Sequence, residues 1–205
     1  LLALIEVATA AKLQARYVLC DKWFSSPATI FSILNKGYEV ICMLKNSSTY
    51  YIYEGNRHTL KQIFRILVDA DRIQRKLDRK AGKGKGNHKK FLFSTIIYLV
   101  NKQDGTTKEV KLVFVRNRNK KSAFLAILCT DTGLTEDQII EFYSTRWGIE
   151  LLFHTCKSFL RLQKSTQSLD YSEIHASTAI IMFQYSMLSW LNRNNSDEIS
   201  FGELF

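Results

Sequence analysis

Four polar side chains recur at fixed intervals in the last third of the chain, within an otherwise apolar stretch. They are Tyr143, Arg146, Glu150 and Lys157. On a continuous helix, at 100° per residue, all four share an arc of about 60°. The positions on both sides of this arc are apolar: Phe142, Trp147, Leu151 and Phe153. Such a stripe is typical of a mostly buried helix that faces either a cleft or an internal ion pair.

The two interpretations of the stripe differ in what Glu150 does. In the simpler one, Glu150 pairs with Arg146 at i,i+4, which stabilises an exposed helix by only about 0.2–0.5 kcal/mol. In the other, Glu150 binds a metal ion, and a single carboxylate then needs a second one from elsewhere in the chain. Helix geometry alone leaves both open.

Asp21 is the natural second carboxylate. It ends the apolar run Tyr17–Cys20, and functional groups in open α/β sheets gather at the carboxyl ends of strands. Asp21 could instead cap the turn that follows the strand. Carboxylates from a strand end and a facing helix suit Mg²⁺ or Mn²⁺. Two such ions about 3.5–4 Å apart can activate a water or a 3′-hydroxyl for phosphoryl transfer.

The first 46 residues predict the strand–helix–strand unit that would position Asp21. A helical pattern over 1–14 precedes a short buried strand at 17–21. Ser25-Ser-Pro27 is a helix start, and that helix should end near Gly37. A second buried strand follows at 39–44. Consecutive strand, helix and strand form a right-handed βαβ unit, so the fold class is α/β.

Residues 47–132 have a different pattern, which predicts a β-rich antiparallel insert. A helix near 59–79 is followed by strand-like runs with a turn at Asp104-Gly105. These runs cover 91–100, 110–115 and 124–129.

Residues 133–205 return to a helical pattern that carries Glu150. A T-x-x-Q capping box at Thr135 begins one helix, which should continue to about Leu160. A last helix is expected from about 172 to 192. We therefore expect three parts: 1–46, 47–132 and 133–205.

The charge of the chain favours a polyanionic partner. Net charge is +10, from 29 Lys and Arg against 19 Asp and Glu. The tract 75–90 holds eight basic residues and one Asp, and therefore +7 of this excess. It could be a flexible connector or a sequence-independent contact with the DNA backbone through Lys83, Lys85, Lys89 and Lys90.

The cysteines and the hydropathy of the chain argue against a zinc site and against a membrane-spanning helix. Four scattered cysteines without metal-ligand spacing predict reduced thiols in a cytosolic protein rather than a zinc site. The most apolar run, 176–191, is interrupted by polar residues and is shorter than the roughly 20 residues of a bilayer span. We expect it to be a buried helix, and no membrane association.

The spacing Tyr143-x₂-Arg146-x₃-Glu150-x₆-Lys157 resembles the Y-(2)-R-(3)-E-(6)-K signature of bacterial insertion-sequence DDE transposases, in the insertion-sequence-four family. Asp21-Lys-Trp-Phe resembles the family's second catalytic Asp at a strand end. The β-rich insert and the segment from Val113 to Asp131 are similar to the same group, so the resemblance covers nearly the whole chain.

The resemblance implies a ribonuclease-H-like catalytic core that binds Mg²⁺ or Mn²⁺ and cuts and joins transposon ends. Asp21 and Glu150 would be catalytic metal ligands, and Tyr143, Arg146 and Lys157 would contact DNA phosphates. The implied partner is double-stranded DNA, bound by a homodimer in the complex that pairs two ends. The implied location is the bacterial cytoplasm, with the nucleoid.

One family feature has no counterpart in these residues. The first catalytic Asp lies on the first core strand, but Glu6 is the only acidic residue before Asp21. We therefore expect an N-terminally truncated chain whose core lacks its first strands and which is inactive alone. The alternative is a non-catalytic, basic DNA-binding remnant of a transposase.

Three further side chains could contact DNA. Arg116 and Arg118 follow a predicted strand and could touch phosphates or only keep a turn solvated. Trp23 could stack on an extruded base beside Asp21, although core packing is the interpretation that the sequence favours.

Overall fold

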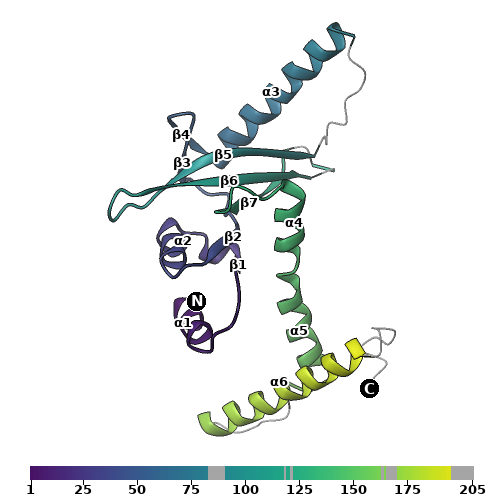
Figure 1. The fold of residues 1–205 in the computed structure, drawn as a ribbon. Helices are drawn as coiled ribbons and strands as arrows, with labels where there is room; N and C mark the ends of the chain where they lie inside the picture. The colour runs from purple at the N-terminus through teal and green to yellow at the C-terminus, as the bar shows by residue number, and fades with distance from the viewer. Residues whose placement is uncertain (83–90, 118, 121, 163, 165–169, 195–205) are drawn as a thin grey trace. The chain divides into compact units, whose positions relative to one another are not determined.

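The structure is a computed structural model that describes the chain except residues 83–90, 118, 121, 163, 165–169 and 195–205 (Figure 1). It divides into two compact units, residues 1–144 and 145–205. The first is a mixed α/β structure, and the described part of the second contains helices but no strand.

The first unit is organised around one seven-stranded sheet in the order β1-β2-β7-β6-β5-β3-β4. Its strands are β1 (Tyr17–Cys20), β2 (Glu39–Met43), β3 (Tyr50–Tyr53), β4 (Asn56–Thr59), β5 (Leu92–Val100), β6 (Thr107–Arg116) and β7 (Phe124–Cys129). β1 and β2 are parallel, and every other pairing is antiparallel. The expected mixed α/β class is confirmed, and the antiparallel strands continue the sheet that β1 and β2 begin.

Several helices of the first unit begin at residues whose side chains satisfy free backbone N–H groups. They are α1 (Leu2–Ala10), the short 3₁₀ helix η1 (Lys22–Phe24), α2 (Pro27–Leu34), α3 (Leu60–Lys80), α4 (Glu136–Ser144), α5 (Trp147–Ser158) and α6 (Tyr171–Asn194). Ser26 caps α2 by accepting from the N–H of Thr29, and Pro27 opens the helix. Past its end, Gly37 adopts a φ of 85°, which glycine tolerates best. The predicted capping box of α4 is present, since Thr135 and Gln138 bond to each other's backbone N–H.

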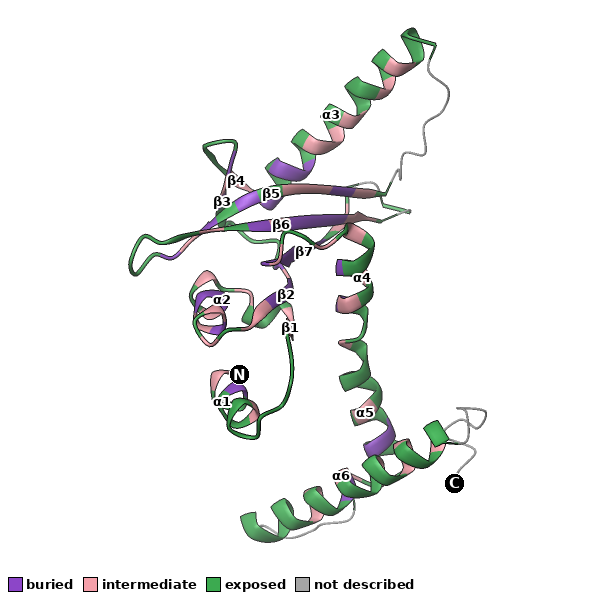
Figure 2. Cartoon of the chain, viewed as in Figure 1, coloured by how far each residue is buried: buried purple, intermediate pink, exposed green. Residues whose placement is uncertain are grey.

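Both faces of the sheet are covered around β2, where successive side chains point to opposite faces and enter two separate core clusters. Val40 and Cys42 belong to one core cluster with residues of α1, α2 and α3. Ile41, between them, belongs to a second cluster with Ile139 and Tyr143 of α4. This two-sided burial explains why β2 is a continuous apolar run. Figure 2 shows the buried residues concentrated along the sheet.

The single helix expected from Thr135 to about Leu160 is wrong. α4 ends at Ser144 and α5 begins at Trp147, with Thr145 and Arg146 between them. There the N–H groups of Gly148 and Ile149 bond three residues back, to the carbonyls of Thr145 and Arg146, at 3.0 and 3.1 Å. Ser, Thr and Gly are weak helix formers, so this segment adopts a tighter turn.

Two details of the expected insert also differ. Arg75–Lys80 form the last turns of α3, so the first part of the basic loop expected at 75–90 is helical. α3 (Leu60–Lys80) itself agrees with the helix expected near 59–79, whose last residues overlap this tract. The hairpin β3–β4 was not predicted; its turn uses Glu54 and Gly55, both with positive φ.

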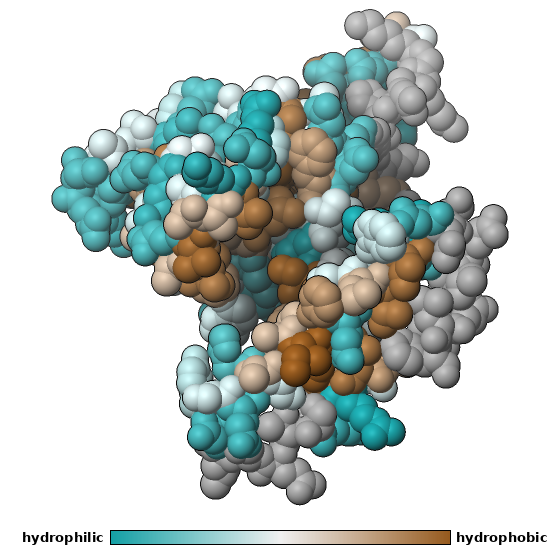
Figure 3. All heavy atoms as spheres, turned by 60° about the horizontal axis from the view of Figure 1, so that its bottom comes forward, coloured by the Kyte–Doolittle hydropathy of each residue, from teal (hydrophilic) through white to brown (hydrophobic). Residues whose placement is uncertain are grey.

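The expected burial of the last helices is not observed. In the described part of the second unit only Thr155, Cys156 and Ile181 are buried. Trp147 on α5 and Phe183 on α6 are 64% and 65% exposed, and apolar side chains gather on the surface in Figure 3. A pattern of apolar residues predicts a helix but does not identify what covers it. No helix among the described residues has the length and apolar character needed to span a bilayer.

Candidate functional site

Asp21 lies directly after β1, where the sequence placed it. The residue is half-buried and precedes η1, and its Oδ1 accepts a hydrogen bond from the backbone N–H of Lys22 at 2.6 Å. The capping role that the sequence left open is therefore formed. Because β1 and β2 are parallel, their carboxyl ends meet at one edge of the sheet, and Lys45 follows β2 at that edge.

Trp23 is exposed beside Asp21, so the interpretation as core packing is wrong. Its side chain is 76% exposed, and the Lys45 Nζ lies 5.5 Å from the centre of its ring. A cation over an indole face makes a favourable contact in this geometry. The edge therefore presents a carboxylate, an accessible aromatic face and an ammonium group within one short region of the first unit.

Tyr143 belongs to the first unit and is part of its core. The residue is 8% exposed and lies with Ile139 in the cluster that covers β2 and β7. Its ring therefore helps to hold α4 against the sheet. The expected contact of Tyr143 with DNA remains a prediction.

Arg146, Glu150 and Lys157 belong to the second unit. The Arg146 Nη2 lies 2.7 Å from the Glu150 Oε1, and the Glu150 side chain is 44% exposed. The i,i+4 ion pair is therefore formed. Glu150 is in the first turn of α5 and the exposed Lys157 in the last, which is the favourable order for the helix dipole.

The sequence-predicted residues are thus divided between the two units. Asp21, Trp23, Arg116 and Tyr143 lie in the first, and Arg146, Glu150 and Lys157 lie in the second. No group of three or more His, Cys, Asp or Glu residues with metal-binding geometry occurs within the part of the chain that the structure describes. Lys83, Lys85, Lys89, Lys90 and Arg118 lie outside the described residues.

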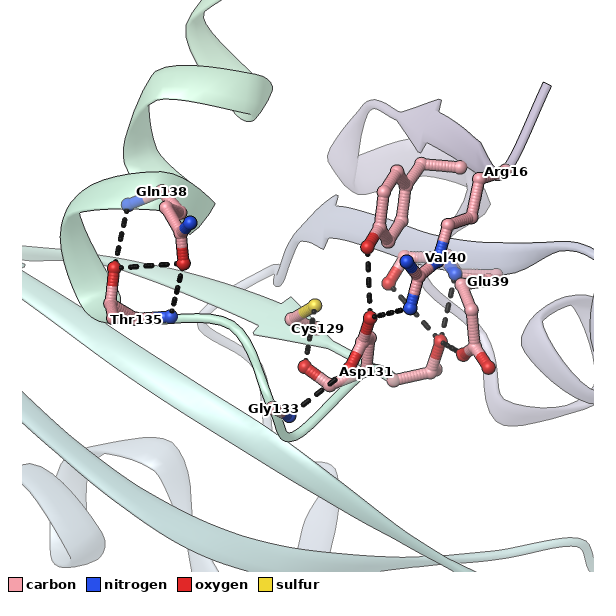
Figure 4. Close-up of polar contacts among 10 residues, drawn as sticks. Arg16, Glu39, Val40, Cys129, Asp131, Gly133, Thr135 and Gln138 are labelled. Carbon is pink, nitrogen blue, oxygen red and sulfur yellow. Dashed lines mark hydrogen bonds and ion pairs between the residues drawn. The ribbon is translucent and has the colours of Figure 1, made fainter.

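A polar cluster that was not predicted lies at the opposite end of β1 from Asp21, where β1 begins and β7 ends (Figure 4). The Oδ2 of Asp131 accepts hydrogen bonds from the Arg16 Nη2 at 2.7 Å and the Tyr17 hydroxyl at 2.8 Å. Its Oδ1 accepts from the N–H of Gly133 at 3.0 Å. The available signal was an Asp soon after a strand, at the start of a loop that leads into a capping box.

The electrostatics of this cluster fit a structural tie. The Tyr17 hydrogen bond, with Gly133 and Arg16, lowers the pKa of Asp131. Burial and the same hydrogen bond raise the pKa of Tyr17 to about 12. Both groups keep their usual charge state near neutrality, so the cluster anchors the loop between β7 and α4.

A second polar tie fixes the start of α4. Glu136 accepts a hydrogen bond from the Ser94 hydroxyl at 2.8 Å and lies 3.0 Å from the Lys111 Nζ. The Ser94 bond, the helix backbone and Lys111 lower the pKa of Glu136 to about 2. These contacts tie α4 to β5 and β6, and so hold the helix that carries Tyr143.

Comparison with known proteins identifies the family. Residues 2–183 match the family described as a transposase DDE domain. The chain is 29% identical over 151 residues to the transposase for insertion sequence element IS231E of Bacillus thuringiensis subsp. finitimus. That match covers 62% of this chain and 31% of that transposase, so the chain spans about a third of its length. No solved structure matches. Together with the Tyr-Arg-Glu-Lys spacing, these matches show that the chain belongs to the DDE transposases of bacterial insertion sequences.

Proposed function

We propose that this chain forms part of a transposase catalytic domain that binds DNA and cleaves and joins its strands by metal-dependent phosphoryl transfer. The observation that carries the proposal is the Tyr143–Arg146–Glu150–Lys157 spacing, within a chain matched to the DDE family over residues 2–183. The proposed core is ribonuclease-H-like, with parts 1–46 and 133–205 separated by an insert at 47–132. The parallel pair β1–β2, with Asp21 at the carboxyl end of β1, supports this assignment.

Asp21 and Glu150 are the proposed metal ligands, since hard carboxylate oxygens suit Mg²⁺ or Mn²⁺. When bound, such an ion would lower the pKa of a water or hydroxyl nucleophile and stabilise the leaving oxygen. In this proposal Arg146 grips a phosphate with its planar fork, while Lys157 supplies a point charge and Tyr143 a hydroxyl donor. Trp23 offers its exposed face to an extruded base.

The same assignment limits what the 205 residues do alone. They contain two of the three expected carboxylates, because Glu6 is the only acidic residue before Asp21. We infer that the chain by itself does not cut DNA. A homodimer on paired transposon ends and a location with the nucleoid in the bacterial cytoplasm belong to the same proposal.

The alternative is a basic DNA-binding remnant without metal chemistry. It is favoured by the formed contacts of both carboxylates: Asp21 caps η1, and Glu150 pairs with Arg146. A measurement of Mn²⁺ binding separates the two candidates. The free ion gives an electron paramagnetic resonance signal that is lost when the ion binds.

We expect Mn²⁺ binding by the full chain, reduced at least tenfold by Asp21→Asn and by Glu150→Gln. Asp104→Asn is the matched control, because that carboxylate lies in an exposed turn and should leave binding unchanged. DNA binding without any Mn²⁺ binding would favour the remnant. Mg²⁺-dependent nicking by the isolated chain that is lost in Glu150→Gln would contradict the inferred inactivity.

A further inference from the structure

A stripe of basic residues runs along one face of α3, separate from the proposed catalytic residues. Its members are Lys61, Arg65, Arg72, Lys76 and Arg79, and all five are exposed. At 100° and 1.5 Å per residue they share an arc of about 60° over about 27 Å. No described residue forms an ion pair with any of the five. Arg75, on a neighbouring face, is different, because it pairs with Asp71 at 2.8 Å.

The N-terminal end of the stripe forms one wall of a groove. Lys61 and Arg65 line this groove of about 570 Å³, and Arg116 and Lys120 line it from the end of β6 and the loop toward β7. Phe64 and Phe124, whose ring centroids are 4.5 Å apart, also line the groove. Asp69 is the one acidic residue of the lining.

Packing fixes the position of this wall. Leu60, Ile63 and Phe64 of α3 are buried against the sheet, and a capping box at Thr59 and Gln62 secures the first turn. The helix backbone that carries Lys61 and Arg65 is therefore fixed against the sheet, and the continuous helix sets the spacing of the other three along its face. Their charge is available to an anionic partner, because none of the five forms an ion pair with a described carboxylate, although Asp69 lies beside Arg65 and Arg72 on the helix.

We propose that the α3 stripe and its groove bind the phosphate backbone of duplex DNA, independently of sequence. The row of about 27 Å matches the rise of about eight base pairs at 3.4 Å each. Single-stranded DNA would require aromatic platforms between the cations. The only aromatic residue of α3 is Phe64, which is 5% exposed. This inference rests on the proposed DNA function, but it assigns a site in the insert that needs no metal.

The test measures binding of the full chain to a short duplex of unrelated sequence, by fluorescence anisotropy in EDTA over a range of salt concentrations. In the variant Arg65→Gln/Arg72→Gln/Lys76→Gln we expect weaker binding. The slope of log affinity against log salt should be less steep by about 2–3, since each lost phosphate contact removes about 0.9.

Two controls make the result specific. Lys12→Gln/Lys102→Gln/Lys108→Gln removes the same charge from outside α3 and should leave the slope unchanged. Arg65→Lys/Arg72→Lys keeps the charge and should also keep the slope. If circular dichroism shows that the triple variant is unfolded, Arg72→Gln/Lys76→Gln replaces it, with an expected change of about 1.8.

The proposal is overturned if the α3 variant has the same slope of log affinity against log salt as the wild type. It is also overturned if the Lys12/Lys102/Lys108 variant reduces that slope by the same amount. A variant that loses binding to phosphatidylserine vesicles but keeps its DNA slope assigns the stripe to a membrane surface and also overturns it. The proposed catalytic function can fail while this inference holds. That outcome is Mn²⁺ binding that Asp21→Asn leaves unchanged, together with a salt slope of DNA binding that the α3 variant still changes.

Discussion

The two units differ in how they use similar apolar sequences. In the first unit, Ile41, Val113 and Leu128 are fully buried between helices and neighbouring strands. In the second, Trp147, Phe183 and Trp190 are all more than half exposed. In the first unit, helices cover the apolar residues on both faces of β2, whereas these three residues of α5 and α6 have no such cover among the described residues. Apolar residues therefore stabilise the fold only where it supplies a surface for them to pack against.

The boundary between the units also divides the signature into two kinds of residue. Tyr143 packs in the core of the first unit, so its position depends on the sheet. Arg146, Glu150 and Lys157 lie on α5, where a local ion pair and the helix itself define their arrangement. The two parts of one sequence motif should therefore respond differently to substitution.

The largest effect should come from the aromatic core of the first unit. Phe114 is fully buried, and its ring centroid lies 5.4 Å from that of Phe64 and 5.2 Å from that of Phe124. We expect Phe114→Ala to lower the free energy of unfolding by about 3–5 kcal/mol, through lost burial and the cavity left behind. Urea denaturation followed by circular dichroism measures this. A change below about 1 kcal/mol, well under the roughly 3–5 kcal/mol typical of such truncations, would mean that this core is not packed as described.

A smaller effect should come from the tie between α4 and the sheet. The pKa of Glu136 is lowered to about 2 from 4.5, so its stabilising contribution is complete above about pH 4.5 and is lost as pH falls toward 2. We expect Glu136→Gln to cost about 1–3 kcal/mol at pH 7, because charge-assisted bonds to Ser94 and Lys111 are weakened. Denaturation at several pH values should show the difference between wild type and variant shrinking below pH 4.5. A difference that grows on acidification contradicts the assignment.

The cap of α3 should contribute less. The Thr59 hydroxyl accepts a hydrogen bond from the N–H of Gln62, and the Gln62 Oε1 accepts one from the N–H of Thr59. We expect Thr59→Ala to cost about 1 kcal/mol, and Thr59→Ser to cost little because it keeps the hydroxyl. Equal losses in both variants would show that the methyl group, rather than the cap, is what matters.

The smallest effects should come from the second unit. Glu150→Gln should lower the free energy of unfolding by about 0.2–0.5 kcal/mol through loss of an i,i+4 ion pair, even though it removes a proposed metal ligand.

Phe183 is 65% exposed, so Phe183→Ala should change the free energy of unfolding by less than about 0.5 kcal/mol. If Phe183→Ala is as damaging as Phe114→Ala, the apolar face of α6 is covered in solution and the comparison between the units fails.

Local chemistry made much of the first unit predictable from the sequence. Ser26-Pro27, Gly37 and the Thr135–Gln138 box mark helix ends because each satisfies or frees backbone groups in a known way. The apolar run Tyr17–Cys20 with Asp21 after it correctly gave a strand end. The hairpin at Glu54-Gly55 escaped prediction because its strands are short and its first strand is rich in tyrosine rather than alternating in polarity.

Long-range contacts account for what the sequence could not give. Nothing local to Asp131 indicates that Arg16 and Tyr17 will reach it across 114 or more positions. The split between α4 and α5 depends on small differences in propensity at Ser144 and Thr145, which a periodic pattern averages out. Exposure of Trp23 likewise depends on which elements surround η1, and no spacing rule encodes that.

The four buried cysteines give the chain built-in reporters of local opening. Cys20, Cys42 and Cys129 are enclosed in the sheet, and burial raises the pKa of each thiol. Cys156 is enclosed on α5. A thiol-alkylating reagent can modify each only when its surroundings open transiently, so the modification rate at each position follows the free energy of that opening. Mass spectrometry of the peptides would measure the alkylation rate of each cysteine, and so compare local opening in the sheet and in α5 within one sample.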